Sequence, residues 1–277
     1  MFDVTSIRKK ILNDGYYHLK NIFDENEINI LRKEIEKSID VSPEYSTRIN
    51  SDNIRDYHQY RSHDNIKRTL RYYMFFHNQD KWNETVKKII LKSLNLRNNI
   101  EEEWIDNFEY NDIKKKLQDY IIVTKYFTDS GLLKYHRDFP KKTEYPLLQF
   151  NILISQPNID YSEGDFIFKD YHGKEIAIQK DLNASMGDAI IFDKHLLHKV
   201  ESTLRGNTDI GRWSILVGTR AEYTSKIRLF VYKSSLFKFY KKFSNLNKWK
   251  MPSVLLTFNI HYYSIWLTML QELEIKA

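Results

Sequence analysis

Two residues of metal-ligand type, His136 and Asp138, stand two positions apart shortly after a β-branched and aromatic run at 121–127. A run of this composition predicts a strand. If the chain resumes as a strand after a turn at Ser130 and Gly131, alternate side chains point to the same face of it. His136 and Asp138 then present an imidazole and a carboxylate on one side, where both can bind a single metal ion.

A third ligand has to come from another part of the chain, because protein sites for transition metals use at least three side chains. His195 and His198 both follow the apolar strand that is expected near 187–193. Two imidazoles and one carboxylate on one side of a metal leave coordination positions open. This arrangement is typical of non-haem Fe(II) oxygenases.

Arg212 opens another expected strand, whose period of two places Arg212 and Ser214 on one face and Trp213 with Ile215 on the other. A guanidinium offers a planar pair of donors that matches a carboxylate. Such a group suits the distal carboxylate of a co-substrate that chelates the metal with its other end. The chemistry of these residues therefore points to 2-oxoglutarate.

Five residues form an ordered set of two imidazoles, a carboxylate, a guanidinium and a hydroxyl: His136, Asp138, His198, Arg212 and Ser214. This set resembles the pattern of the Fe(II)/2-oxoglutarate-dependent dioxygenases of the phytanoyl-CoA dioxygenase-like and prolyl-hydroxylase-like kind, and it favours His198 over His195. Residues 161–168 resemble the Gly-Gly-x-Phe region of prolyl-hydroxylase-like members, although Glu163 replaces the first glycine. The resemblance covers residues 120–220.

The resemblance implies that His136, Asp138 and His198 bind Fe(II). It also implies 2-oxoglutarate as co-substrate, with its far carboxylate on Arg212 and Ser214, and O2 as the oxidant. Halogenating members replace the ligand carboxylate by a small residue, so Asp138 favours hydroxylation, with desaturation and ring closure left open. Four further polar residues are candidates to bind co-substrate or substrate from inward faces: Thr124, Tyr126, Gln149 and Asn151.

The expected fold is mainly β with helical additions, and many short strands at close spacing favour a jelly roll. The resemblance likewise implies a double-stranded β-helix, the cupin-like core, flanked by N-terminal and C-terminal helices. We expect one domain over 1–277, with a mostly helical part at 1–119, a jelly-roll core at 120–232 and a basic, aromatic helical extension at 233–277.

The elements that should build this fold can be placed on the sequence. Nine core strands are expected near 121–128, 132–137, 147–155, 164–169, 173–178, 187–193, 197–202, 212–219 and 226–232. An earlier strand is expected at 14–23, followed by a helix with Asp24 as N-cap and Glu27 completing a capping box. Further helices are expected over 67–73, 81–94 and 100–120.

Composition narrows the classes of partner. The chain has 277 residues, a net charge of +6 and no cysteine, which excludes disulfides and thiolate metal ligands. The mild positive charge favours anionic partners.

Residues 42–79 are polar and either form a solvated loop followed by a helix or line the mouth of the active site and bind an anionic substrate. Five arginines occur there: Arg48, Arg55, Arg61, Arg68 and Arg71.

The two ends of the sequence bear on location. No apolar segment of a secretory signal is recognisable after Met1, so cytoplasmic residence is expected. Residues 233–250 interleave lysines with aromatic residues, a pattern that suits peripheral contact with the inner, anionic face of a membrane. The apolar segments at 254–270 are interrupted by Asn259 and His261, which favours a terminal helix docked on the domain over a transmembrane span.

Several functions remain open at this point. We expect a hydroxylase acting on a small anionic or carrier-linked metabolite. A peptide or protein hydroxylase of the same superfamily is an alternative, as is a non-catalytic cupin-like module with a structural zinc ion. A nucleic-acid partner is not expected, and steep salt dependence of binding would be the sign of one.

Overall fold

The computed structural model describes residues 2–44, 55–101, 117–138 and 146–222. The chain divides into two units, Met1–Thr224 and Ser225–Ala277, and all described residues belong to the first. The described residues of this unit contain three α-helices and a short 3-10 helix: α1 (Val4–Asp14), α2 (Glu25–Val41), α3 (Glu84–Glu101) and η1 (Phe76–Lys81). Its strands are β1 (Tyr16–Leu19), β2 (Tyr57–His63), β3 (Ile66–Phe75), β4 (Leu117–Tyr126), β5 (Gly131–His136), β6 (Leu148–Leu153), β7 (Tyr161–Glu163), β8 (Phe166–Lys169), β9 (Glu175–Ala177), β10 (Ala189–Asp193), β11 (His198–Arg205) and β12 (Arg212–Glu222).

These strands form one antiparallel sheet in the order β1-β10-β6-β12-β4-β3-β5-β11-β8-β9, with β2 paired to β3 and β7 to β11. Most neighbouring strands, such as β1 and β10 or β12 and β4, are distant in sequence, which is typical of a jelly roll. β3 pairs with β4 over most of its length and with β5 at its start, so it joins the two halves of the sheet. Eight of the nine expected core strands are present with ends within four residues of the expected ones, and the ninth, at 226–232, lies outside the described residues.

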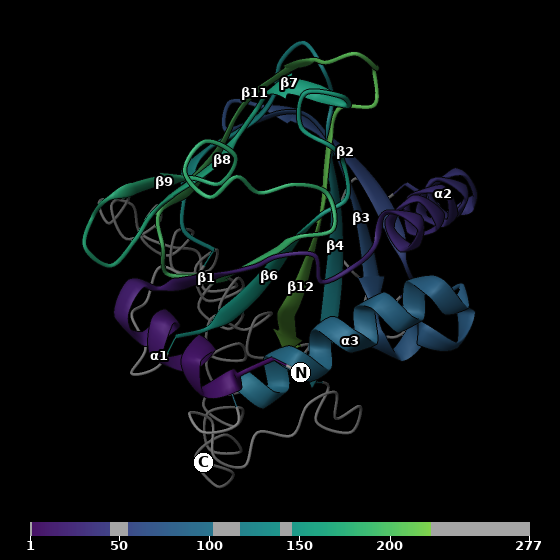
Figure 1. Cartoon of the computed structure of the whole chain (residues 1–277). Coiled ribbons are helices and arrows are strands. Elements are labelled where there is room, and N and C mark those ends of the chain that lie inside the picture. Colours follow the sequence, from purple (N-terminus) through teal and green to yellow (C-terminus); the bar gives the residue numbers. More distant parts are fainter. Residues whose placement is uncertain (1, 45–54, 102–116, 139–145, 223–277) are drawn as a thin grey trace, which may run out of the picture. The chain divides into compact units, whose positions relative to one another are not determined.

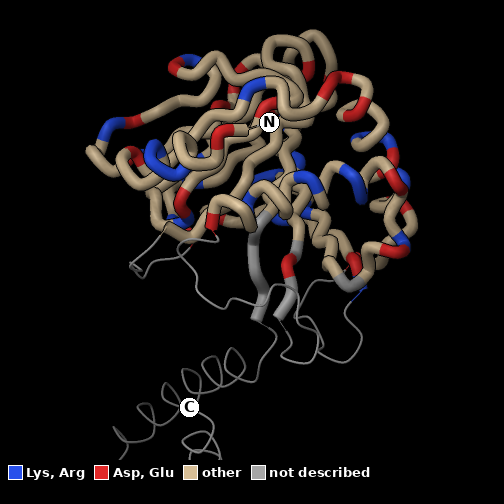
Figure 2. The backbone as a smooth tube through the Cα atoms, turned by 60° about the horizontal axis from the view of Figure 1, so that its bottom comes forward, with Lys and Arg blue, Asp and Glu red and all other residues tan. Residues whose placement is uncertain are grey.

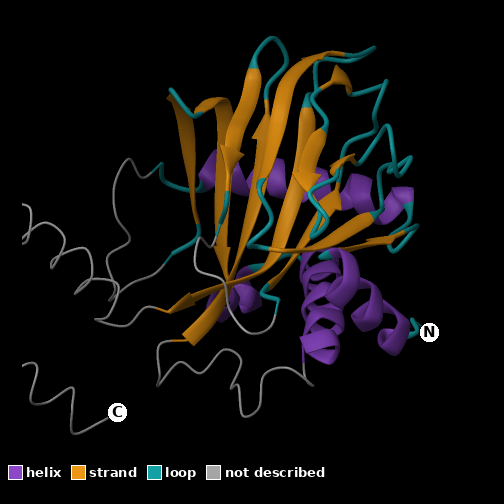
Figure 3. Cartoon of the chain, turned by 90° about the vertical axis from the view of Figure 1, so that its left-hand side faces the viewer, coloured by secondary structure: helices purple, strands orange, loops and turns teal. Residues whose placement is uncertain are grey.

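Strict alternation along the central strands separates two apolar layers. Ile191 of β10 packs with the helices, whereas its neighbours Ile190 and Phe192 face the interior between the halves of the sheet. Trp213 and Ile215 likewise join the layer against the helices. The helices lie along one side of the strands (Figure 1, Figure 3). The other face of the central strands is therefore free to carry polar side chains into the interior.

The N-terminal helices begin where the sequence provides caps. Asp24 accepts a hydrogen bond from the amide of Glu27, and the Glu27 side chain accepts one from the Asp24 amide, which confirms the predicted capping box. α1 begins after Asp3 and ends at Gly15, whose φ of +84° closes the helix in the left-handed conformation. The strand expected at 14–23 is present in its central part as β1.

Two helix predictions are wrong. Residues 67–73 belong to β3, where Tyr72 and Met74 face the helices and Tyr73 and Phe75 face the opposite side. This segment forms a strand instead of a helix because it pairs with β4 along its length, which satisfies its backbone hydrogen-bonding groups inside the sheet. The helix expected over 100–120 is wrong at its C-terminal end, since Leu117–Tyr126 is a strand, and its part at 102–116 lies outside the described residues. The helix expected over 81–94 is present as α3 but extends to Glu101.

Basic and acidic residues are interspersed over the described backbone, as Figure 2 shows. No helix among the residues that the structure describes is long and apolar enough to cross a bilayer. The basic segment 233–250 and the C-terminal helical extension lie outside the described residues, so a membrane contact there stays a prediction.

Candidate metal centre

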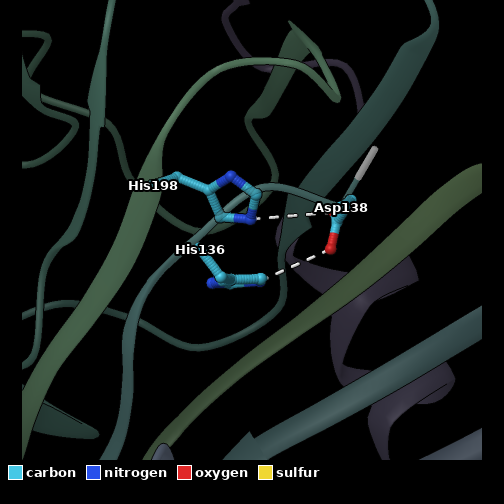
Figure 4. A group of neighbouring side chains, drawn as sticks. All are labelled: His136, Asp138 and His198. Carbon is cyan, nitrogen blue, oxygen red and sulfur yellow. Dashed lines mark ion pairs between the residues drawn. The ribbon is translucent and has the colours of Figure 1, made fainter. Parts of the chain in front are cut away.

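The two imidazoles come together because their strands are paired. His136 is the last residue of β5 and His198 the first of β11, and the antiparallel register places them directly opposite each other. Asp138 follows β5 by two residues, and its carboxylate lies 3.4 Å from Nε2 of His136 and 3.7 Å from Nε2 of His198. The three side chains converge in Figure 4, with one ligand atom of each within 4.8 Å of the others.

Backbone carbonyls fix the tautomer of both rings. Nδ1 of His136 lies 3.0 Å from the carbonyl oxygen of Lys134, and Nδ1 of His198 lies 2.9 Å from that of Leu196. A carbonyl only accepts, so each Nδ1 must donate its proton. Each Nε2 then keeps a lone pair facing Asp138, the orientation that metal-binding histidines need.

The protonation states of His198 and Asp138 favour the binding of a metal cation. His198 is 3% exposed, and burial lowers its pKa to about 4, so the ring is neutral at neutral pH. Burial opposes ionisation of Asp138, but the neighbouring His136 and the charges of nearby basic groups hold the pKa of the carboxyl well below its usual range. Gln149 donates a hydrogen bond of 3.1 Å from Nε2 to Oδ2 of Asp138. The centre therefore offers two imidazole nitrogens, that of His198 neutral, and one negative oxygen.

This centre opens into a cavity of about 320 Å³. Five predicted site residues besides the three metal ligands line it: Tyr126, Gln149, Asn151, Arg212 and Ser214. Thr124 is not in the lining, but it lies in register between Arg71 and Ser214, which are. Gln149 contacts a metal ligand, which differs from the co-substrate contact expected for it.

Arg212 is the best candidate to bind an acid. It is 1% exposed, and neither Nε nor Nη2 has a hydrogen-bond partner within the described part of the chain. Its guanidinium carbon lies 5.6 Å from the centre of the Tyr126 ring, and the group hydrogen-bonds Tyr161. Burial raises the pKa of Tyr161 to about 12, so this hydroxyl stays neutral and adds no negative charge beside Arg212. Two buried donors without partners fit the far carboxylate of 2-oxoglutarate.

Sequence reasoning did not single out two features of the site. Arg71 was one of five arginines in a polar segment, and the structure places it in the cavity lining. Tyr161 is buried, and its hydroxyl accepts a hydrogen bond of 2.6 Å from Gln179 while holding Arg212. Alternation along β3 would have placed Arg71 on the face of Tyr73, once that segment was recognised as a strand.

The rival histidine has another partner. Nδ1 of His195 lies 2.7 Å from Oδ1 of Asp193, and His195 is not part of the three-residue centre.

The structure also explains why Glu163 can replace the first glycine of the expected pair. Glu163 is exposed, whereas a Cβ on Gly164 would lie 2.6 Å from Oγ1 of Thr203, so only the second position of the expected glycine pair requires glycine.

No protein-family model and no curated protein matches this sequence. Solved structures do match. A Pseudomonas putida prolyl-4-hydroxylase is 9% identical, with 77% of this chain and 96% of that chain covered and a TM-score of 0.51. A Burkholderia pseudomallei oxidoreductase of the 2OG-Fe(II) oxygenase family is 11% identical over 80% and 91%, with a TM-score of 0.46. The alpha ketoglutarate dependent epimerase SnoN from nogalamycin biosynthesis is 12% identical over 80% and 83%, with a TM-score of 0.46.

At such identities, a structural likeness shows the fold alone. The chain has the fold of the P. putida prolyl-4-hydroxylase, a double-stranded β-helix with added helices, as the sequence predicted. The candidate ligand set, by contrast, rests on the distances between His136, Asp138 and His198 in this chain.

Proposed function

We propose that this protein is an Fe(II)- and 2-oxoglutarate-dependent oxygenase that hydroxylates a C–H bond of a small substrate. One observation carries the proposal. A single cavity contains a two-histidine, one-carboxylate centre and, on another strand, a buried arginine with two donors that have no partner in the described residues. The metal centre alone would fit several functions, and the added carboxylate receptor favours this one.

The roles of the chain's own residues follow from their positions. His136 and His198 offer Nε2 lone pairs from one side, and Asp138 adds the negative charge that favours a divalent cation. Arg212 pairs with the far carboxylate of 2-oxoglutarate and so orients its keto acid end toward the metal. Bound Fe(II), 2-oxoglutarate and O2 together supply the oxidising chemistry, in which one oxygen atom enters the substrate C–H bond and the other enters succinate as CO2 is lost.

Apolar side chains keep water away from His198, the buried member of the predicted metal ligands. The rings of Phe166 and Phe192 lie 5.4 and 5.3 Å from that of His198, and Val200 completes this wall of the cavity. A dry wall strengthens the attraction between Arg212 and an acid, because the local dielectric is low.

Two other functions make different predictions. A structural zinc site usually has four protein ligands, and it has no need of Arg212, so a non-catalytic module is less well supported. A peptide hydroxylase remains the second candidate, because the solved structure with the TM-score of 0.51 is a prolyl-4-hydroxylase. Comparing proline-containing peptides with small organic acids as stimulants of succinate formation would separate the two kinds of substrate.

The decisive experiment is an anaerobic titration of the apoprotein with Fe(II) and then 2-oxoglutarate, followed through the visible charge-transfer band of a metal-chelated keto acid. We expect the band in the wild type, its loss in His136→Ala and a much weaker affinity for 2-oxoglutarate in Arg212→Gln. Arg205→Gln, an exposed arginine on β11, is the matched control and should behave as the wild type. Absence of the band in the wild type would refute the oxygenase function.

A further inference from the structure

The cavity contains a second arginine that the chemistry above does not use. Arg71 lies on β3, opposite Thr124 of β4, and lines the cavity with the metal ligands. Its Nε is buried and has no hydrogen-bond partner in the described residues. The hydroxyls of Tyr73 and Tyr126 hydrogen-bond the guanidinium and so hold it in place. No carboxylate in the described segments forms an ion pair with it.

A buried guanidinium without a direct ion pair is costly, because the charge has lost water, and the carboxylate that acts on it, Asp138, is itself a predicted metal ligand. Arg71 and Arg212 lie two rows apart along the strands. One row pairs Arg71 with Thr124 and Ser214, and the row two residues further along β4 pairs Tyr126 with Arg212. The cavity lining therefore contains two separate arginines in addition to Lys194.

The co-substrate can satisfy only one of these arginines. Of the two carboxylates of 2-oxoglutarate, one belongs to the keto acid end that faces the metal and the other is assigned to Arg212. Arg71 lines the same cavity as His136, Asp138 and His198. An acid held by Arg71 would therefore lie in the cavity into which the metal centre opens.

We propose that Arg71 binds a carboxylate of the primary substrate, an inference that rests on the proposed function. The substrate is then a carboxylic acid, with its acid group on Arg71 and a neighbouring C–H bond toward the metal. One guanidinium balances one negative charge, which favours a carboxylate over a phosphate dianion. The lining also includes Ile122, Leu133 and Leu216, which can contact an apolar part of a compact acid.

The first test asks whether Arg71 serves the co-substrate. The dissociation constant of 2-oxoglutarate is measured anaerobically on the Fe(II)-loaded wild type and on Arg71→Gln, Arg212→Gln and Arg61→Gln. Arg61 is the matched control, because it lies on the paired strand β2, near the Tyr73 ring, and is not in the cavity lining. We expect Arg71→Gln to stay within threefold of the wild type, roughly 0.7 kcal/mol, and Arg212→Gln to lose affinity at least tenfold, about 1.4 kcal/mol.

The second test asks whether Arg71 recognises an acid. Phenylacetate and phenylacetamide, which share a shape and differ in charge, are titrated by calorimetry into the anaerobic Fe(II)–2-oxoglutarate complex. We expect the wild type and Arg61→Gln to bind the acid at least tenfold more tightly than the amide, about 1.4 kcal/mol. Arg71→Gln should lose this preference, and Arg71→Lys, which keeps the charge, should recover part of it.

The outcomes separate the two proposals. If Arg71→Gln weakens 2-oxoglutarate binding as much as Arg212→Gln does, both arginines hold the co-substrate and the inference is overturned. A wild type that binds acid and amide equally also overturns it, while the oxygenase function stands. If the wild type forms no complex with Fe(II) and 2-oxoglutarate, the proposed function itself fails and the inference with it.

Discussion

Replacing Gln149 by leucine should weaken metal binding without removing a metal ligand. Gln149 is 2% exposed on β6, and its amide donates to Oδ2 of Asp138 at 3.1 Å. This hydrogen bond orients the only carboxylate among the three predicted ligands. Leucine has a volume similar to that of glutamine. Position 149 lies opposite Phe192 in the sheet register, so an apolar side chain fits the site.

The size of the effect can be estimated from the one interaction that is lost. A hydrogen bond to a charged group contributes about 1.5–3 kcal/mol. Partners that orient a metal ligand change metal affinity by about 10- to 100-fold when they are removed, which corresponds to about 1.4–2.8 kcal/mol. The two ranges agree, so we expect the dissociation constant of Fe(II) to rise by about 10- to 100-fold in Gln149→Leu.

The assay is an anaerobic titration of the apoprotein with Fe(II) in competition with a coloured chelator of known affinity. Asn151→Leu is the matched control, because Asn151 lies on the same strand and lines the same cavity, and its Oδ1 has no partner in the described part of the chain. An unchanged affinity in Gln149→Leu, or an equal loss in both variants, would show that the hydrogen bond to Asp138 does not prepare the centre.

The other predictions concern stability and are measured by urea unfolding of the apoprotein. Asp188→Asn should lower the free energy of unfolding by about 1–3 kcal/mol. Burial opposes ionisation of Asp188, but hydrogen bonds, including the one with His18, lower its pKa below 3.8. The contribution of Asp188 to the free energy of unfolding is therefore present above pH 4 and disappears as the pH falls through the lowered pKa. Gly187→Ala should cost more than about 1 kcal/mol, because φ is +88° and a Cβ would lie 2.3 Å from the carbonyl oxygen of Phe23. Leu31→Ala, at a site with 0% exposure, should cost about 2–5 kcal/mol. An unfolding curve like that of the wild type would contradict each expectation.

Alternation made much of the site predictable. A period of two is a local property of the sequence, so the inward positions of Arg212 and Ser214, and those of Gln149 and Asn151, followed without knowledge of how the strands pair. The structure places all four in the cavity lining. The sequence could not show which inward residue contacts which. The hydrogen bond between Gln149 of β6 and Asp138, which follows β5, is a consequence of tertiary structure.

The strand β3 was missed because its sequence carries a mixed signal. Lys67 and Arg68 are exposed and charged, and Arg68 has a φ of +38°, which interrupts the regular strand near its start. The remainder becomes a strand through its pairing with β4, a contact far away in sequence. Without that strand, Arg71 could not be distinguished from the other arginines of the polar segment, and so the second cationic receptor remained hidden.

The division of the cavity between the two halves of the sheet has a consequence for specificity. The histidines belong to β5 and β11, whereas Arg71 and Arg212 belong to β3 and β12. β3 joins the halves through its pairing of Ile66 with Leu133, so Arg71 stands on the strand that fixes the distance between the acid receptor and the metal. A substitution at Arg71 can therefore change the class of substrate while the backbone that positions the metal ligands stays the same. Function on a shared fold varies in this way through a few side chains at the site.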